Sequence, residues 1–188
     1  LYGHSMGGGI AAAVAARSPE IFEKVILSSP MIRPLTGGVP WHVAKAIAKT
    51  SCKVGREANY VVGQKPYKEP AKFEDSCSLS HARFEYYEEK RTKESHYHLN
   101  APSYGWLGNA MRLNRYLEKT GWRKIEASVM LFSAGKDNLV SNAEQERFVR
   151  KLNKNRPGSA ELVKFPESKH EIFNAENTIA EEYWKKVF

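Results

Sequence analysis

The chain contains little cysteine and no long apolar run. Its 188 residues include two cysteines, Cys52 and Cys77. Their spacing matches no metal-binding or redox motif, so reduced thiols are expected. No apolar stretch approaches the roughly 20 residues that a membrane-spanning helix needs. The composition therefore argues against a disulfide-stabilised scaffold, and no membrane-spanning helix is expected.

The chain also lacks internal repeats, low-complexity tracts and any nucleic-acid-binding module pattern. Hydrophobic residues make up 41% and charged residues 27%, which is ordinary for one globular domain or most of one plus an insertion. Lys and Arg number 29 against 21 Asp and Glu, a formal net charge of +8. Basic and acidic residues alternate over 88–94, which favours a solvated helix face over a nucleic-acid surface. An excess of positive charge is compatible with anionic membrane surfaces or acidic substrates.

The most informative feature that is present is a G-x-S-x-G pentapeptide, residues 3–7. Two apolar or aromatic residues precede it and a small-residue helical pattern follows over 8–17. A strand, a sharp turn and a helix in this order are typical of the nucleophile elbow of an α/β-hydrolase. The pattern predicts Ser5 as a nucleophile in a strained backbone conformation, with flanking glycines that avoid collisions. The Met6 amide would lie at the helix N-terminus and stabilise an oxyanion.

The position of this motif predicts that further strands precede it in a longer protein. A doubly wound sheet does not normally start at its nucleophile, and a second oxyanion donor comes from a loop after an earlier strand. Without those strands a sheet edge would lack its partner. We therefore expect these 188 residues alone to fold poorly and to be inactive.

The rest of the chain predicts an α/β fold with a mostly parallel sheet and a helical cap insertion. Buried strands are expected over 24–28, 128–133 and 161–165, and a closing amphipathic helix over 177–188. Ser141 and Glu144 form a capping box that opens another helix. Between the strands at 24–28 and 128–133, residues 31–126 show helical patterns over 39–50, 78–94 and 104–120 without a clear buried strand. The predicted organisation is a hydrolase core of 1–30 and 127–188 and a cap of 31–126, whose aromatic residues could line an acyl pocket or only pack against one another.

Two polar residues follow buried strands and complete a catalytic pattern with Ser5. Asp137 comes after the strand at 128–133, and His170 lies in the loop after the strand at 161–165. Carboxyl ends of parallel strands meet at one rim of a sheet, and the chain order Ser, Asp, His is that of this fold. His170 is expected to accept the Ser5 proton, and Asp137 to fix the imidazole tautomer and stabilise the imidazolium.

Other titratable residues near these motifs have different expected roles. Glu171, next to His170, is an alternative acid, whereas His4 is expected to pack or hydrogen bond within the elbow rather than act as a base. His96 and His98 share one side of an extended segment, but no third ligand is evident, so no metal site is expected.

These motifs resemble the lysophospholipase and monoacylglycerol lipase family of serine hydrolases. The resemblance rests on GHSMGG at 3–8, SAGKDNLV at 133–140 and KHE at 169–171. SHARF at 80–84 and APSYGWL at 101–107 look like the bacterial lysophospholipase branch. The family implies an eight-stranded core, a helical cap between the sixth and seventh strands, and hydrolysis of fatty acyl esters without a cofactor. It assigns Ser5, Asp137 and His170 to the triad and Met6 to the oxyanion site.

The expected function is a serine carboxylesterase that acts on lysophospholipids or monoglycerides. A peptidase or amide hydrolase on the same fold remains an alternative, because a triad does not separate esters from amides. An inactive fragment that binds a lipid or a partner is a third. The expected partner is a small amphiphilic lipid rather than nucleic acid. The expected location is the cytoplasm, with peripheral membrane contact left open.

Overall fold

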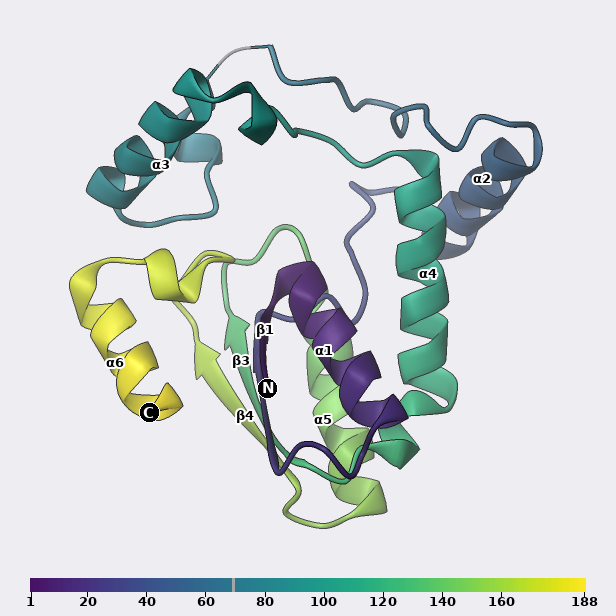
Figure 1. Cartoon of the computed structure of the whole chain (residues 1–188), viewed down its shortest axis with the longest axis vertical. Helices are drawn as coiled ribbons and strands as arrows, with labels where there is room; N and C mark the ends of the chain where they lie inside the picture. Colours follow the sequence, from purple (N-terminus) through teal and green to yellow (C-terminus); the bar gives the residue numbers. More distant parts are fainter. Residues whose placement is uncertain (69) are drawn as a thin grey trace. The chain divides into compact units, whose positions relative to one another are not determined.

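The core of the structure is a four-stranded parallel sheet. The computed structural model describes residues 1–68 and 70–188. The strands are β1 (Tyr2–His4), β2 (Lys24–Ser28), β3 (Ser128–Ala134) and β4 (Ala160–Phe165), in the spatial order β1-β2-β3-β4. Every neighbouring pair is parallel. The predicted α/β fold class is therefore confirmed, and the three strands expected after the elbow lie within one residue of their predicted bounds (Figure 1).

Side chains alternate between the two faces of this sheet along β2 and β3. Val25 pairs with Val129 and Leu27 pairs with Leu131. These four side chains are buried in one cluster, while the residues between them belong to the opposite face. This period of two is the geometry of a strand, and both faces are apolar because helices cover both.

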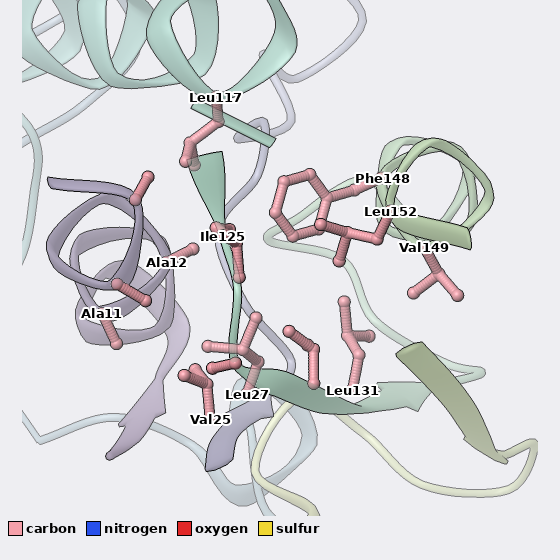
Figure 2. Packing of buried hydrophobic residues seen from close by; sticks show 14 of the residues in the cluster. Ala11, Ala12, Val25, Leu27, Leu117, Ile125, Leu131, Phe148, Val149 and Leu152 are labelled. Atoms are coloured by element: carbon pink, nitrogen blue, oxygen red, sulfur yellow. The ribbon is translucent and has the colours of Figure 1, made fainter. Parts of the chain in front are cut away.

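One face of the sheet is covered by α1 (Ser5–Arg17) and α5 (Asn142–Asn155). Figure 2 shows alanines of α1 and larger side chains of α5 directed at β2 and β3. The small side chains of α1 allow its backbone to lie close to the sheet, as the alanine run predicts. The cluster contains Ala11, Ala12, Ala15, Ala16, Val25, Leu27, Val129, Leu131, Phe148, Val149 and Leu152.

The opposite face is covered by α6 (Asn177–Val187) (Figure 1). Tyr183 is fully buried there, and its ring centroid lies 4.7 Å from that of Phe132. Phe165 and Ile172 complete this second cluster. The closing helix therefore anchors the C-terminal segment to the sheet, directly after the loop that carries His170.

The remaining helices follow β2 and precede β3 in the chain. They are α2 (Trp41–Lys53), α3 (His81–Lys93) and α4 (Tyr104–Lys119), with short 3₁₀ turns at η1 (Phe73–Asp75), η2 (Ser95–Tyr97) and η3 (Gly121–Lys124). A fourth short 3₁₀ turn, η4 (Ile172–Asn174), lies between β4 and α6. Ser141 is confirmed as the N-cap of α5, because its hydroxyl accepts from the Glu144 amide at 3.3 Å. The reciprocal bond of the predicted capping box is not formed, because the Ser141 amide donates to the Arg33 backbone oxygen at 3.0 Å and the Glu144 carboxylate pairs with Arg33. No helix in the described part of the chain has both the length and the apolar character needed to cross a bilayer.

The chain forms two compact units. The first contains residues 1–35, 77–79 and 113–188, and the second contains 36–76 and 80–112. The second unit has its own apolar cluster, in which Ala44 and Ala48 of α2 pack against Tyr104, Leu107 and Met111 of α4. The second unit falls within the predicted cap, whereas residues 31–35, 77–79 and 113–126 group with the sheet.

Candidate active site

Ser5 is the first residue of α1 and directly follows β1. Its φ angle is 53°, in the left-handed region that a non-glycine residue rarely adopts. The backbone oxygen of Ser5 accepts a hydrogen bond from the Met31 amide at 2.7 Å, which ties the turn to the segment after β2. This strained serine between a strand and a helix has the geometry expected of a nucleophile elbow.

Close packing explains two of the glycines around Ser5. A Cβ on Gly3 would lie 2.5 Å from the Gly7 oxygen, and one on Gly8 would lie 2.8 Å from Cβ of Pro30. A Cβ on Gly7 would meet nothing within 4 Å. The expectation that glycines flank the serine to avoid collisions therefore holds for Gly3 and is wrong for Gly7. Gly8, and not Gly7, is the second position where a side chain would collide, because α1 passes directly against Pro30.

Met6, the candidate oxyanion donor, is the second residue of α1. The first turn of this helix contains no acidic residue, and His4 at the N-cap makes no side-chain capping bond. The helix therefore does not neutralise its own N-terminal partial charge, which favours an anion at this end.

Asp137 lies in the loop that follows β3, and its carboxylate is fixed by that loop. Oδ1 accepts hydrogen bonds from the amides of Leu139 at 2.9 Å and Val140 at 3.1 Å. Gly135 brings this loop close to the loop after β4, since a Cβ at Gly135 would lie 2.2 Å from the Pro166 oxygen. One carboxylate oxygen is thus held by the backbone, and Oδ2 is left for a second partner.

That second partner is His170. Its Nδ1 lies 2.7 Å from Oδ2 of Asp137, and both side chains are buried. Nδ1 donates to the carboxylate in this arrangement, so Nε2 of a neutral imidazole is an acceptor. Within the described residues Nε2 is buried and has no hydrogen-bond partner. The pair therefore presents a basic nitrogen oriented by an acid, which is the arrangement of a general base.

The ring of His170 lies against the residue that precedes Ser5. The ring centroids of His4 and His170 are 4.8 Å apart. His4 is itself fixed by a hydrogen bond from Nδ1 to the Ser28 backbone oxygen at 3.1 Å and by an edge contact with Phe173. The structure therefore joins Asp137 to His170 directly and brings the His170 ring against His4 of the elbow. In the part of the chain described, His170 Nε2 accepts no hydrogen bond from the Ser5 hydroxyl.

His4 is neutral at working pH. Burial, followed by the charge of nearby His170, lowers the pKa of His4 from 6.5 to about 4. A neutral ring donates one hydrogen bond and packs, which agrees with the structural role expected from the sequence and leaves the base role to His170.

The lowered pKa of His4 predicts acid destabilisation. In the unfolded chain His4 binds a proton near pH 6.5, whereas the folded protein resists protonation until about pH 4. The contribution of neutral His4 to the free energy of unfolding is therefore fully present above pH 6.5. It is lost as the pH drops toward 4, by roughly 3 kcal/mol for a shift of this size. Urea unfolding of the full-length protein and a His4→Gln variant between pH 7 and 4 measures this. A difference between the two free energies of unfolding that stays constant with pH would contradict it.

Two neighbouring groups do not compete for these roles. Glu171, the alternative acid, accepts a hydrogen bond from the Asn174 amide group at 2.9 Å. Burial and then the Glu171 charge raise the pKa of the Cys77 thiol to about 11, so the thiol stays protonated and is a weak nucleophile. Both cysteines are free.

The sequence analysis did not identify Ser29 as part of this site. Ser29 follows β2 and is fully buried, and its hydroxyl donates to the His170 backbone oxygen at 2.8 Å. The sequence offers only a serine pair before a proline after a buried strand, which predicts a strand end and no contact. Among the described residues, no cluster of three or more His, Cys, Asp or Glu side chains has the arrangement of a metal site.

Comparison with known proteins identifies the family. The family model described as "Serine aminopeptidase, S33" matches residues 1–177. The chain belongs to this family. A search of curated proteins finds no match.

Solved structures similar to this serine aminopeptidase family member include lipases and an esterase. A soluble variant of monoglyceride lipase from Saccharomyces cerevisiae is 18% identical with a TM-score of 0.72, over 99% of this chain and 59% of that one. Monoacylglycerol lipase from Paleococcus ferrophilus is 20% identical with a TM-score of 0.71, over 100% and 65%. A thermostable carboxyl esterase from Bacillus coagulans is 17% identical with a TM-score of 0.68, over 99% and 61%.

These similarities confirm the α/β-hydrolase fold and the predicted likeness to monoacylglycerol lipases. The chain spans about three fifths of the length of these relatives. The elbow and the loops with Asp137 and His170 all lie within the residues that match the family.

Proposed function

We propose that the protein is a serine hydrolase that cleaves fatty acyl esters of monoglycerides or lysophospholipids. The single observation that supports this most strongly is the 2.7 Å contact between His170 and Asp137, with the His170 ring against the strained elbow of Ser5. The substrate class comes from the monoglyceride lipases among the similar structures.

The proposed reaction has two steps. Ser5 Oγ attacks the ester carbonyl carbon as His170 Nε2 takes the hydroxyl proton, and the Met6 amide stabilises the oxyanion. The carbon–oxygen bond to the alcohol then breaks, and the alcohol leaves with the proton from His170. Water attacks the acyl-enzyme in the same way, releasing the fatty acid and restoring Ser5.

A peptidase is the second candidate, because the matched family is described as a serine aminopeptidase. The same triad chemistry serves esters and amides, and an aminopeptidase needs a carboxylate that holds the substrate's free amine. Near the proposed triad, Glu171 is already paired with Asn174. The lipases and the esterase among the similar structures favour the ester reaction.

Substrate comparison tests the proposed function. We expect the full-length protein to hydrolyse a long-chain monoglyceride or lysophosphatidylcholine at least about tenfold faster, as kcat/KM, than a short p-nitrophenyl ester, because each buried methylene strengthens binding. Aminoacyl p-nitroanilides should be turned over far more slowly than any of these esters. The reverse order, with the anilides preferred, would establish the peptidase function instead.

We also propose that α2 contacts an anionic membrane surface as a peripheral site. Residues 41–53 include three lysines and no carboxylate. Ala44 and Ala48 pack inward, while Val43 and Ile47 are 39% and 41% exposed. The helix therefore has exposed apolar side chains on one side and lysines elsewhere around its surface, a composition found in helices that lie in a membrane interface.

Vesicle flotation tests this contact. Val43→Ser with Ile47→Ser, and separately Lys45→Glu with Lys49→Glu, should each weaken binding to vesicles containing phosphatidylglycerol by about tenfold or more, since both apolar burial and lysine charge contribute. Val62→Ser with Leu99→Ser is the matched control, because both side chains are 83% exposed and lie off α2. Equal losses in all three variants, or no vesicle binding by the unaltered protein, would refute the contact.

A further inference from the structure

Ser29 shares an unusual backbone conformation with Ser5. Within the described residues these are the two non-glycine residues at positive φ, 53° for Ser5 and 40° for Ser29. Ser29 is also completely buried. Such a conformation persists only where the surroundings fix it, and strained residues concentrate at functional sites. Ser29 directly follows β2, the strand next to β1 and the elbow, so its contacts near the candidate site are of interest.

Ser29 joins three segments that are distant in sequence. Its amide donates to the Phe132 backbone oxygen at 2.8 Å, which links the end of β2 to β3. Its hydroxyl donates to the backbone oxygen of His170, also at 2.8 Å and 141 residues away. Ser29, in its left-handed conformation, is therefore hydrogen bonded both to β3 of the sheet and to the backbone of His170.

The preceding residue holds the other histidine. The Ser28 backbone oxygen accepts from Nδ1 of His4, whose ring lies against the His170 ring. The consecutive residues Ser28 and Ser29 thus fix two contacting histidines. His170 is held at Nδ1 by Asp137, at its backbone oxygen by Ser29, and on its ring by His4.

We infer that Ser29 is a positioning residue for His170, which sets the direction of Nε2 by anchoring the backbone oxygen of the base. This inference rests on the proposed function. His170 lies in the loop after β4 rather than within a strand or helix, so few regular backbone bonds fix it. Small displacements of a catalytic base lower the rate of the chemical step far more than they weaken substrate binding.

Two substitutions separate the hydroxyl from the backbone conformation. Ser29→Ala removes the hydrogen bond and retains the strained φ, whereas Ser29→Gly removes the bond and adopts positive φ without strain. With p-nitrophenyl butyrate, each variant should lower kcat about five- to tenfold with KM changed less than twofold, as expected for one buried hydrogen bond lost. Ser159→Ala is the matched control, because that buried hydroxyl also donates to a backbone oxygen, Leu152, outside this site.

A spectroscopic measurement accompanies the kinetics. The His170 Nδ1 proton bound to Asp137 should give a low-field proton NMR signal that broadens or shifts in both Ser29 variants and stays in place in Ser159→Ala. Circular dichroism establishes that the compared variants are folded, and where Ser29→Ala does not fold, the unstrained glycine variant decides.

The outcomes distinguish this inference from the proposed function. An active protein whose Ser29 variants keep the normal kcat and NMR signal overturns the positioning role and leaves the function intact. Recovery of activity in Ser29→Gly alone also overturns it, because relief of strain would then explain the loss in Ser29→Ala. If the unaltered protein hydrolyses no ester, the proposed function fails, and the NMR signal alone decides whether Ser29 positions His170.

Discussion

Ser5→Ala is expected to lower ester hydrolysis by the full-length protein by at least about 10⁴-fold, because the covalent route through an acyl-enzyme is lost. Ser5 is held at positive φ where β1 meets α1, and it follows His4, whose ring lies against the His170 ring. Alanine fits the same backbone and removes only the hydroxyl. Stability should therefore change little while activity disappears.

Labelling with a fluorophosphonate probe gives the direct measurement for this variant. The unaltered protein should gain one label, found at Ser5 by peptide mass spectrometry, and Ser5→Ala should gain none. Ser128→Ala is the control, because Ser128 is exposed at the opposite end of β3. Labelling at another residue, or full activity in Ser5→Ala, would exclude Ser5 as the nucleophile. No label and no ester hydrolysis in the unaltered protein would favour the alternative of a binding protein without catalysis.

Asp137→Asn is expected to lower kcat by roughly 10³- to 10⁴-fold with little change in fold. The loop amides of Leu139 and Val140 donate to Oδ1 of Asp137, and an asparagine oxygen would keep both bonds. Its amide NH₂ would then face Nδ1 of His170, where the carboxylate oxygen now lies. A donor at that place forces the proton onto Nε2, so the imidazole is no longer able to accept the Ser5 proton.

Glu171→Gln is the matched control for this variant. Glu171 is the other carboxylate next to His170, but it pairs with Asn174. The Glu171→Gln variant should keep nearly full kcat. Nitrogen NMR of the His170 imidazole should show the changed tautomer in Asp137→Asn alone. A large loss in Glu171→Gln with normal activity in Asp137→Asn would transfer the acid role to Glu171.

Local sequence patterns were sufficient to predict most elements of the fold. The β-branched run at 24–28 is a strand because alternate side chains pack on opposite faces of the sheet, and Ser141 starts a helix because its hydroxyl caps the Glu144 amide. The helix after the elbow starts at Ser5, three residues earlier than the pattern predicted. Helical periodicity places the repeating side chains and does not mark the first turn.

The site was predicted only in part. Position after a strand selected Asp137 and His170, and these are the residues in contact. The role of Gly8 in place of Gly7, and the contacts of Ser29, depend on which distant backbone passes close by. Pro30 and His170 approach these residues from other segments, so no local pattern contains that information.

The sequence alone determined which chemical groups are present, the order in which they occur, and which strand each one follows, because local periodicity and turn residues act over a few neighbours. Only the tertiary structure decided which nitrogen faces which oxygen. The lateral packing of parallel strands brings together segments as much as 141 residues apart, and hydrogen bonds such as that from Ser29 to His170 depend on that packing rather than on neighbouring residues.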